Sequence, residues 1–188
     1  MTALARGENR PAPADRMTVT VTCSAPVDVS ALLLGASGKV RSDADFVFFN
    51  QPAGPGVTYR HGQGAGDVVD IQTGALPTDV ERVVVTASLD GSGPRTFAGV
   101  NSLLATIGSS SGTLTFPMTG LSTETAVVCV EIYRRAGAWK VRAVGQGYDN
   151  GLAGIATAFG VDIEAEPAQA EPAQAAPAQA APASAAQP

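Results

Sequence analysis

Alternating and continuous apolar runs predict a body made of short β-strands. Residues 17–23 alternate Thr with Val or a similar apolar residue, as a half-buried strand does. Continuous apolar runs bounded by Gly, Pro or Asp are typical of buried strands, and they occur at residues 30–34, 46–49 and 83–89. Residues 126–134 and 139–144 form two further β-rich arms around the dipeptide Ala136-Gly137, which predicts a hairpin.

A single helix is expected at the end of this body, over residues 150–159. Apolar side chains fall on one helical face at Leu152, Ile155, Ala156 and Phe159. Asp149 or Asn150 can cap its start, and Gly160 can end it. Many short strands with one helix favour a mainly β fold, a two-sheet β-sandwich with a short C-terminal helix, and they leave no room for a parallel α/β sheet.

The two ends of the chain differ in composition from this body. From residue 164 a five-residue unit of the type EPAQA repeats, without any aromatic or branched apolar residue to bury. Such a segment cannot offset its ordering entropy, so we expect residues 164–188 to be a disordered, extended tail. Residues 1–16 are expected to be a flexible N-terminus. The sandwich domain is therefore predicted over residues 17–163.

Charge and cysteine content narrow the class of protein. The net charge of −5 and the pI of about 4.7 argue against nucleic-acid binding, which relies on basic surfaces. We recognise no secretory signal, and no apolar stretch is long enough to be a transmembrane segment. Two cysteines, Cys23 and Cys129, give no disulfide framework, although a single bridge between them stays open. A reduced, cytoplasmic protein is expected.

Two short motifs resemble enzyme signatures but lack the context that catalysis needs. Glycines within residues 145–151 follow a strand as in a dinucleotide-binding loop, but three residues instead of two precede the third glycine. Residues 108–112 read GSSSG, the pattern of a hydrolase nucleophile centred on Ser110. The base for that nucleophile would have to be His61, the one histidine of the chain. We therefore expect no enzymatic activity.

Oxygen-bearing side chains beside the predicted turns are the stronger candidates for a site. Turns of a sandwich cluster at the ends of its sheets, so acids distant in sequence can converge there. Ca²⁺ takes six to eight oxygen ligands from carboxylates, amides and backbone carbonyls. The candidate ligands are Asp28, Asp43, Asp45, Asn50, Asp67 and Asp70. No EF-hand loop is present, and solvated turn acids without any metal are the alternative interpretation.

Longer motifs give the chain a resemblance to a known family. Residues 28–34 (DVSALLL) and 38–50 (GKVRSDADFVFFN) resemble the opening half of the bacterial TerD family of tellurium-resistance and stress proteins. Residues 131–140 (EIYRRAGAWK) and 142–148 (RAVGQGY) resemble its second half, in the same order and spacing. The resemblance covers residues 17–163.

This resemblance implies a two-sheet β-sandwich that binds calcium, is not an enzyme and serves in chemical stress through membrane-linked or partner assemblies. Asp43, Asp45 and Asn50 match the family's acidic pattern SDxDFVFYN directly. Asp70 is not a motif position and remains a nearby candidate.

Two departures from the family pattern reduce the expected number of calcium ligands. Pro26 stands at the first acid of the first pattern, which leaves only Asp28. Residues 64–67 (GAGD) stand where the family has GDDE, which leaves only Asp67. Because affinity follows the number of charged ligands, we expect one or two weakly bound Ca²⁺ ions.

The leading expectation is a calcium-binding stress-response protein that meets protein partners of the same stress system. The alternative is a metal-free protein-interaction module that has lost calcium binding.

Overall fold

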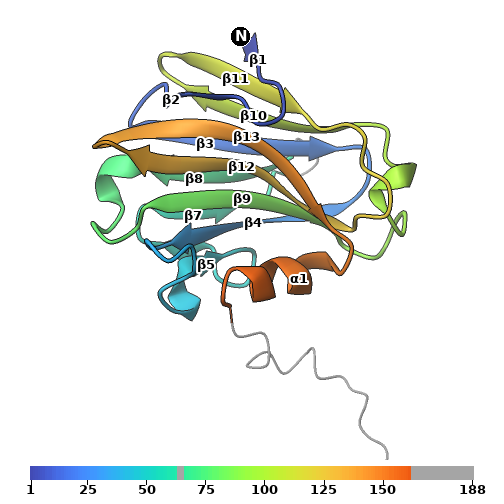
Figure 1. Ribbon diagram of the computed structural model, residues 1–188. Coiled ribbons are helices and arrows are strands. Elements are labelled where there is room, and N and C mark those ends of the chain that lie inside the picture. The colour runs from blue at the N-terminus through green and yellow to red at the C-terminus, as the bar shows by residue number, and fades with distance from the viewer. Residues whose placement is uncertain (63–65, 162–188) are drawn as a thin grey trace, which may run out of the picture.

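Two mainly antiparallel sheets form the body of the protein in the computed structural model, which describes residues 1–62 and 66–161 (Figure 1). The order of strands in the first sheet is β1 (Thr2–Ala3), β11 (Gly112–Pro117), β10 (Leu103–Ser109), β3 (Arg16–Cys23), β8 (Asp67–Gln72), β7 (Val57–Arg60) and β6 (Ala53–Gly54). The order in the second sheet is β2 (Asn9–Pro11), β13 (Ala138–Tyr148), β12 (Ala126–Arg135), β9 (Arg82–Leu89), β4 (Val27–Leu34) and β5 (Phe46–Val47). Short 3₁₀ turns cover Asp43–Asp45, Thr73–Ala75 and Phe97–Gly99. The predicted two-sheet β-sandwich is confirmed.

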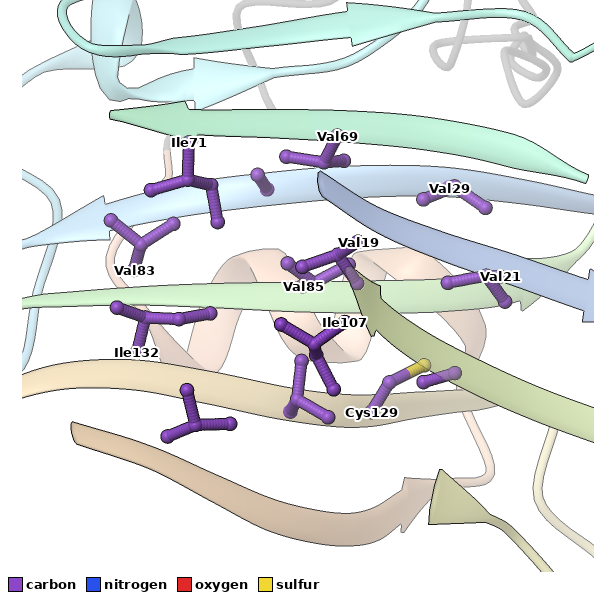
Figure 2. Close-up of a cluster of buried hydrophobic side chains, with 14 of the residues drawn as sticks. Val19, Val21, Val29, Val69, Ile71, Val83, Val85, Ile107, Cys129 and Ile132 are labelled. Atoms are coloured by element: carbon purple, nitrogen blue, oxygen red, sulfur yellow. The ribbon is translucent and has the colours of Figure 1, made fainter. Parts of the chain in front are cut away.

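The main core lies between the two sheets, where side chains of alternate residues meet. In β3 every second residue, Met17, Val19 and Val21, is buried, as the alternating pattern predicts. Figure 2 shows how Val19 and Ile107 of the first sheet lie near Val85 and Cys129 of the second. This packing fixes the sheets against each other and so fixes the positions of the loops at their ends.

The second sheet is buried on both faces over β4, β9 and β12. Helix α1 (Gly151–Ala158) packs on its outer face, where Ile155 joins a second apolar cluster with Leu32, Leu34 and Val84 (Figure 1). A strand covered on both sides needs apolar residues at every position. The continuous apolar runs at 30–34 and 83–89 have this cause, whereas β3 alternates.

The helix ends as predicted, but its start is not capped by a side chain. Gly160 has a φ of +85° and follows the last turn, in the left-handed conformation that glycine favours. Asn150 occupies the cap position without any side-chain hydrogen bond to the helix backbone. Instead, the Nζ atom of Lys39 donates to the carbonyl oxygen of Ala158 at 2.7 Å and stabilises the other end.

Residues 46–49 were expected to form one buried strand, and this expectation is wrong for its second half. Strand β5 contains only Phe46 and Val47, because the chain turns at Phe48, which exchanges backbone hydrogen bonds with Gln51. The Phe49 side chain is 55% exposed as a result. The strand is therefore a short edge that ends in an exposed aromatic residue.

The first 16 residues, expected to be a flexible N-terminus, contain two edge strands. Strand β1 pairs in parallel with β11, and β2 pairs with β13. Leu4 is buried in the core, and its backbone N–H donates to the carbonyl of Thr115 at 2.7 Å. Backbone pairing and one apolar anchor thus hold a segment without a strand-like sequence pattern. The predicted tail, residues 164–188, lies outside the described residues.

The β12–β13 hairpin turns at Ala136-Gly137, as predicted, with φ values of +54° and +79°. Two positive values at adjacent positions are those of a type I′ turn, in which Asn is preferred to Ala at the first position. We expect Ala136→Asn to raise the free energy of unfolding by about 0.5–1 kcal/mol, since it relieves this strain. Urea denaturation measures the change. Ala138→Asn, in the adjoining strand, is the control and should not stabilise.

Candidate functional site

Three carboxylates line one pocket beside the start of β4. Asp28 is the second residue of β4 and lies directly opposite Ser88 of β9. Asp90 follows the end of β9, and its backbone N–H donates to the carbonyl of Pro26 at 3.3 Å. Antiparallel pairing of β4 and β9 therefore brings Asp28 and Asp90 together from distant parts of the sequence. Asp67, the first residue of β8, reaches the same pocket from the other sheet.

Tyr59, His61 and Phe49 also line the pocket, together with Pro26 and Val27. The Tyr59 hydroxyl donates to Oδ2 of Asp67 at 2.7 Å, and Nδ1 of His61 lies 2.8 Å from Oδ1 of Asp67. The backbone N–H of Gly62 also donates to that Oδ1 at 3.2 Å. Burial, followed by the bond to Asp67, raises the pKa of Tyr59, so this phenol stays protonated at neutral pH. Asp67 is thus already well supplied with hydrogen-bond donors.

Asp28 has the least compensated charge of the three acids. Burial raises the pKa of its carboxyl, and the nearby carboxylates of Asp90 and Asp67 raise it further. Within residues 1–62 and 66–161 the side chain of Asp28 accepts no hydrogen bond and forms no ion pair. Asp90, by contrast, is stabilised in its charged form, because the hydroxyl and backbone N–H of Ser92 lower its pKa. A cation in this pocket would relieve Asp28 most.

Asp43 and Asp45 lie away from this pocket, in the 3₁₀ turn before β5. Asp45 is buried and accepts hydrogen bonds from the backbone N–H, Nε and Nη2 of Arg41, at 2.9, 2.8 and 2.8 Å. Asp43 is exposed, and its backbone carbonyl accepts a hydrogen bond from the Gln51 amide at 2.8 Å. The Asp45 carboxylate therefore forms an ion pair with Arg41, and this pair stabilises the loop before β5.

Asn50 and Asp70, the remaining candidate ligands, lie in different places. Asn50 is exposed and follows Phe49, which lines the pocket. Asp70 lies in a separate groove on the first sheet, where Arg60 and the Thr18 hydroxyl donate to its two oxygens at 2.6 and 2.8 Å. These donors, Arg60 first, lower the pKa of Asp70. The structure therefore brings Asp28 and Asp67 to one pocket. Asn50 is adjacent to this pocket in sequence, whereas Asp43, Asp45 and Asp70 do not line it.

The carboxylate oxygens at the pocket are of the type that a hard cation binds. Their side chains, however, are not grouped closely enough to hold one ion as they stand. Carboxylate oxygens are the ligands that Ca²⁺ takes. In the part of the chain that the structure describes, however, no three His, Cys, Asp or Glu side chains are grouped closely enough to hold one metal ion. The pocket offers converging acids whose loops would have to draw closer around an ion.

Asp90 is the site residue that sequence reasoning missed. It stands alone in the Gly-rich loop DGSG, and no spacing links it to the other acids. The predicted strands at 30–34 and 83–89 contained the missing signal. If the two pair in antiparallel fashion, the residues before the first strand lie beside those after the second.

The two enzyme-like motifs do not lie in the structural contexts that their signatures require. Ser110 lies in the turn of the β10–β11 hairpin, where Ser109 is paired with Gly112. Gly145 and Gly147 lie inside β13, next to a bulge at which the pairing with β12 shifts between Val128 and Val130. Neither glycine lies in the turn between β13 and α1. The thiols of Cys23 and Cys129 are both free. No described helix has the length and apolarity needed to cross a membrane.

Comparison with known proteins gives the chain a family. Residues 16–159 match the model of the TerD domain. The tellurium resistance protein TerD of an Alcaligenes species is 37% identical over 150 residues, which cover 72% of this chain and 78% of that protein. General stress protein 16U of Bacillus subtilis (strain 168) is 30% identical over 151 residues, which cover 73% of this chain and 78% of that protein.

A solved structure has the same fold. The crystal structure of a homologue of the telluride resistance protein (TerD) from Streptomyces coelicolor A3(2) superimposes with a TM-score of 0.59 at 21% identity. The match covers 76% of this chain and 95% of that one. Together with the family match over residues 16–159, this likeness agrees with the two-sheet sandwich described above, and the chain belongs to the TerD family of tellurium resistance and stress proteins.

Proposed function

We propose that this protein is a cytoplasmic, non-enzymatic calcium-binding protein of a bacterial stress response, and that it acts through contacts with protein partners. Its relatives are named for tellurium resistance, general stress and resistance to chemical damaging agents. Those names describe protection of a cell and no shared reaction. Asp28, Asp67 and Asp90 would hold one Ca²⁺ ion, and Asn50, which follows Phe49 of the pocket lining, is a further candidate oxygen donor.

The observation that carries this proposal is that the half-buried Asp28 shares one pocket with the carboxylates of Asp67 and Asp90. A half-buried carboxylate with two acidic neighbours costs free energy unless a cation balances it. Its raised pKa means that the folded protein binds this proton more tightly than the unfolded chain. Without metal, its contribution to stability is therefore greatest below the unfolded pKa, and it is lost as the pH rises through the folded pKa. Bound Ca²⁺ would reverse that penalty at neutral pH.

Asp28→Asn is expected to change stability in opposite directions with and without calcium. In chelator at pH 7 the variant should melt at a higher temperature than the wild type, because it removes an uncompensated charge. With millimolar Ca²⁺ the wild type should gain stability by mass action, while the variant gains little. Scanning calorimetry measures both effects, and isothermal titration with Ca²⁺ and with Mg²⁺ gives the affinity and the number of ions.

Glu81→Gln is the matched control, since it removes one negative charge at the far end of β9 from the pocket. It should leave calcium binding unchanged. Asp43→Asn and Asp45→Asn test the other candidate ligands: the proposal predicts that Asp43→Asn binds calcium as the wild type does. Absence of titration heat, together with a melting temperature that neither Ca²⁺ nor chelator changes, would refute calcium binding.

The second candidate function is a metal-free interaction module. It is favoured by the fact that Asp45 and Asp67 already have protein partners that fill their oxygens. In this case the fold alone presents the binding surface, and partner capture would survive in chelator and in Asp28→Asn. Partner capture that needs calcium would exclude this alternative.

A further inference from the structure

The outer face of the second sheet is divided into two halves. Helix α1 covers the half that contains Leu32, Leu34 and Val84. The other half, over β9, β12 and β13, carries cationic side chains. We name Arg82, Lys140 and Arg142, together with the buried Tyr133 and Glu131 between them, the cationic face.

Strand register places these side chains in two adjacent rows. Tyr133 of β12 lies directly between Arg82 of β9 and Lys140 of β13. In the next row on the same face, Glu131 lies beside Arg142. Because directly opposite residues of a ladder point to the same side of the sheet, all five side chains share one surface.

Positive charge is in excess on the cationic face. Glu131 pairs with both arginines, with its oxygens 2.9 Å from Nη1 of Arg142 and 3.3 Å from Nε of Arg82. The Arg142 guanidinium also stacks 4.6 Å from the centre of the Tyr133 ring. Among the described residues Lys140 forms no ion pair. One carboxylate therefore faces three cations, on a protein whose net charge is −5.

The last described residue lies on the same outer face of the second sheet as the cationic face. Val161 is buried in the cluster under α1 with Leu34 and Val84, and its backbone N–H donates to the carbonyl of Ala156 at 2.8 Å. Leu34 is directly opposite Arg82 in the β4–β9 ladder. The last described residue thus lies on the outer face of the second sheet, in the cluster that contains Leu34, the ladder partner of Arg82.

The segment that follows is acidic. Asp162, Glu164, Glu166 and Glu171 lie within its first ten residues, and residues 162–188 contain no Lys or Arg. An extended chain advances about 3.3 Å per residue, so Glu166 can lie about 17 Å from Val161. Arg82 and Lys140 are two strand spacings apart, about 10 Å. The reach of the acidic segment is therefore sufficient to span the cationic face, and its charge is opposite to that of the face.

We propose that residues 162–171 dock on the cationic face of the same molecule, with Glu164 and Glu166 over Arg82, Lys140 and Arg142. The repeats that follow are then held as an arm that starts at this face. Docking in cis also occupies a surface that would otherwise attract acidic partners, because the tether gives the segment a high effective concentration. This inference is independent of calcium binding at the pocket of Asp28.

Nuclear magnetic resonance of the full chain tests the docking. The wild type is compared with a neutral-tail variant carrying Glu164→Gln, Glu166→Gln and Glu171→Gln. At low salt the amide signals of the cationic face should differ between the two chains. The difference should vanish at about 0.5 M NaCl, where charges are screened beyond a few ångströms. Signals of the pocket around Asp28 should stay the same.

Charge reversal on the face provides the second arm of the test. Lys140→Glu, which leaves two cations against two carboxylates on the face, should abolish the difference between the wild-type and neutral-tail chains. Arg95→Glu, an exposed reversal in the loop that follows β9, is the control and should have no effect. The neutral-tail chain should also bind an added oligoglutamate peptide several-fold more tightly than the wild type does.

Three results would overturn the proposal. Identical wild-type and neutral-tail spectra would mean that the face does not hold the segment. Differences that grow with protein concentration would assign the contact to a second copy of the chain. Equal binding of oligoglutamate by both chains would show that the segment does not compete for the face. The spectrum of each variant reports its folding independently.

Discussion

Arg41→Met should lower the free energy of unfolding by about 3 kcal/mol at pH 7, the largest loss expected from any single exposed-loop substitution in this protein. The reason is the carboxylate that remains. Asp45 is 1% exposed and depends on Arg41 for three hydrogen bonds, two of which come from the guanidinium. Removing one partner of a buried pair leaves an uncompensated charge, which costs more than the pair itself contributes. Urea denaturation followed by circular dichroism measures the loss.

Asp79→Asn is the matched control for this prediction. Nη1 of Arg41 also pairs with Asp79 at 2.8 Å, but the Asp79 side chain is 69% exposed. An exposed pair contributes about 0–1 kcal/mol, so the control should lose no more than that. Similar losses in the two variants would contradict the structural role of Asp45.

The Arg41→Met variant also tests the calcium ligands expected from sequence. Its Asp45 carboxylate loses the guanidinium that covers both oxygens. If Asp45 were a calcium ligand, millimolar Ca²⁺ should restore most of the lost stability by binding only to the folded form. With calcium at the pocket of Asp28 instead, Ca²⁺ should stabilise the variant and the wild type by the same amount, and the difference between them should persist.

Local sequence patterns predicted most of the sandwich because burial alone determines them. Strand β3 alternates because only one of its faces is buried, and β9 is a continuous apolar run because both of its faces are buried. Strands β1 and β2 could not be predicted, since two or three residues held by backbone hydrogen bonds need no particular side chains. Phe48 and Phe49 were wrongly predicted to continue strand β5, because aromatic residues favour strands by composition even where the chain turns.

The candidate site was less predictable than the fold, because it depends on the pairing of distant segments. A carboxylate beside a turn can bind a metal, pair with a cation or remain in water, and its neighbours along the chain do not decide among these. Asp45 shows the difficulty: Arg41, four residues before it, is its partner, although the same sequence matches a calcium motif. Asp90 shows the converse, because only the register of β4 against β9 gives it a role.

Ile132→Ala should lower the free energy of unfolding by about 2–5 kcal/mol through the cavity it leaves between the sheets. Ile132 is fully buried on β12, between Val83 of β9 and Val141 of β13, and it points toward the facing sheet (Figure 2). Small domains have about 5–15 kcal/mol of stability in total, so this one substitution removes a large share.

The control at the same position is Ile132→Val, which removes a single methylene group and should cost only about 0.5–1.5 kcal/mol. Both variants keep a β-branched or small apolar side chain, so neither disturbs the hydrogen bonds of the ladder. Urea denaturation gives both values, and the midpoint should fall without a change in its slope if the native fold is kept. Equal costs for the two variants would mean that the sheets close over the cavity. In that case the core between them would be more deformable than the dense packing around Ile132 implies.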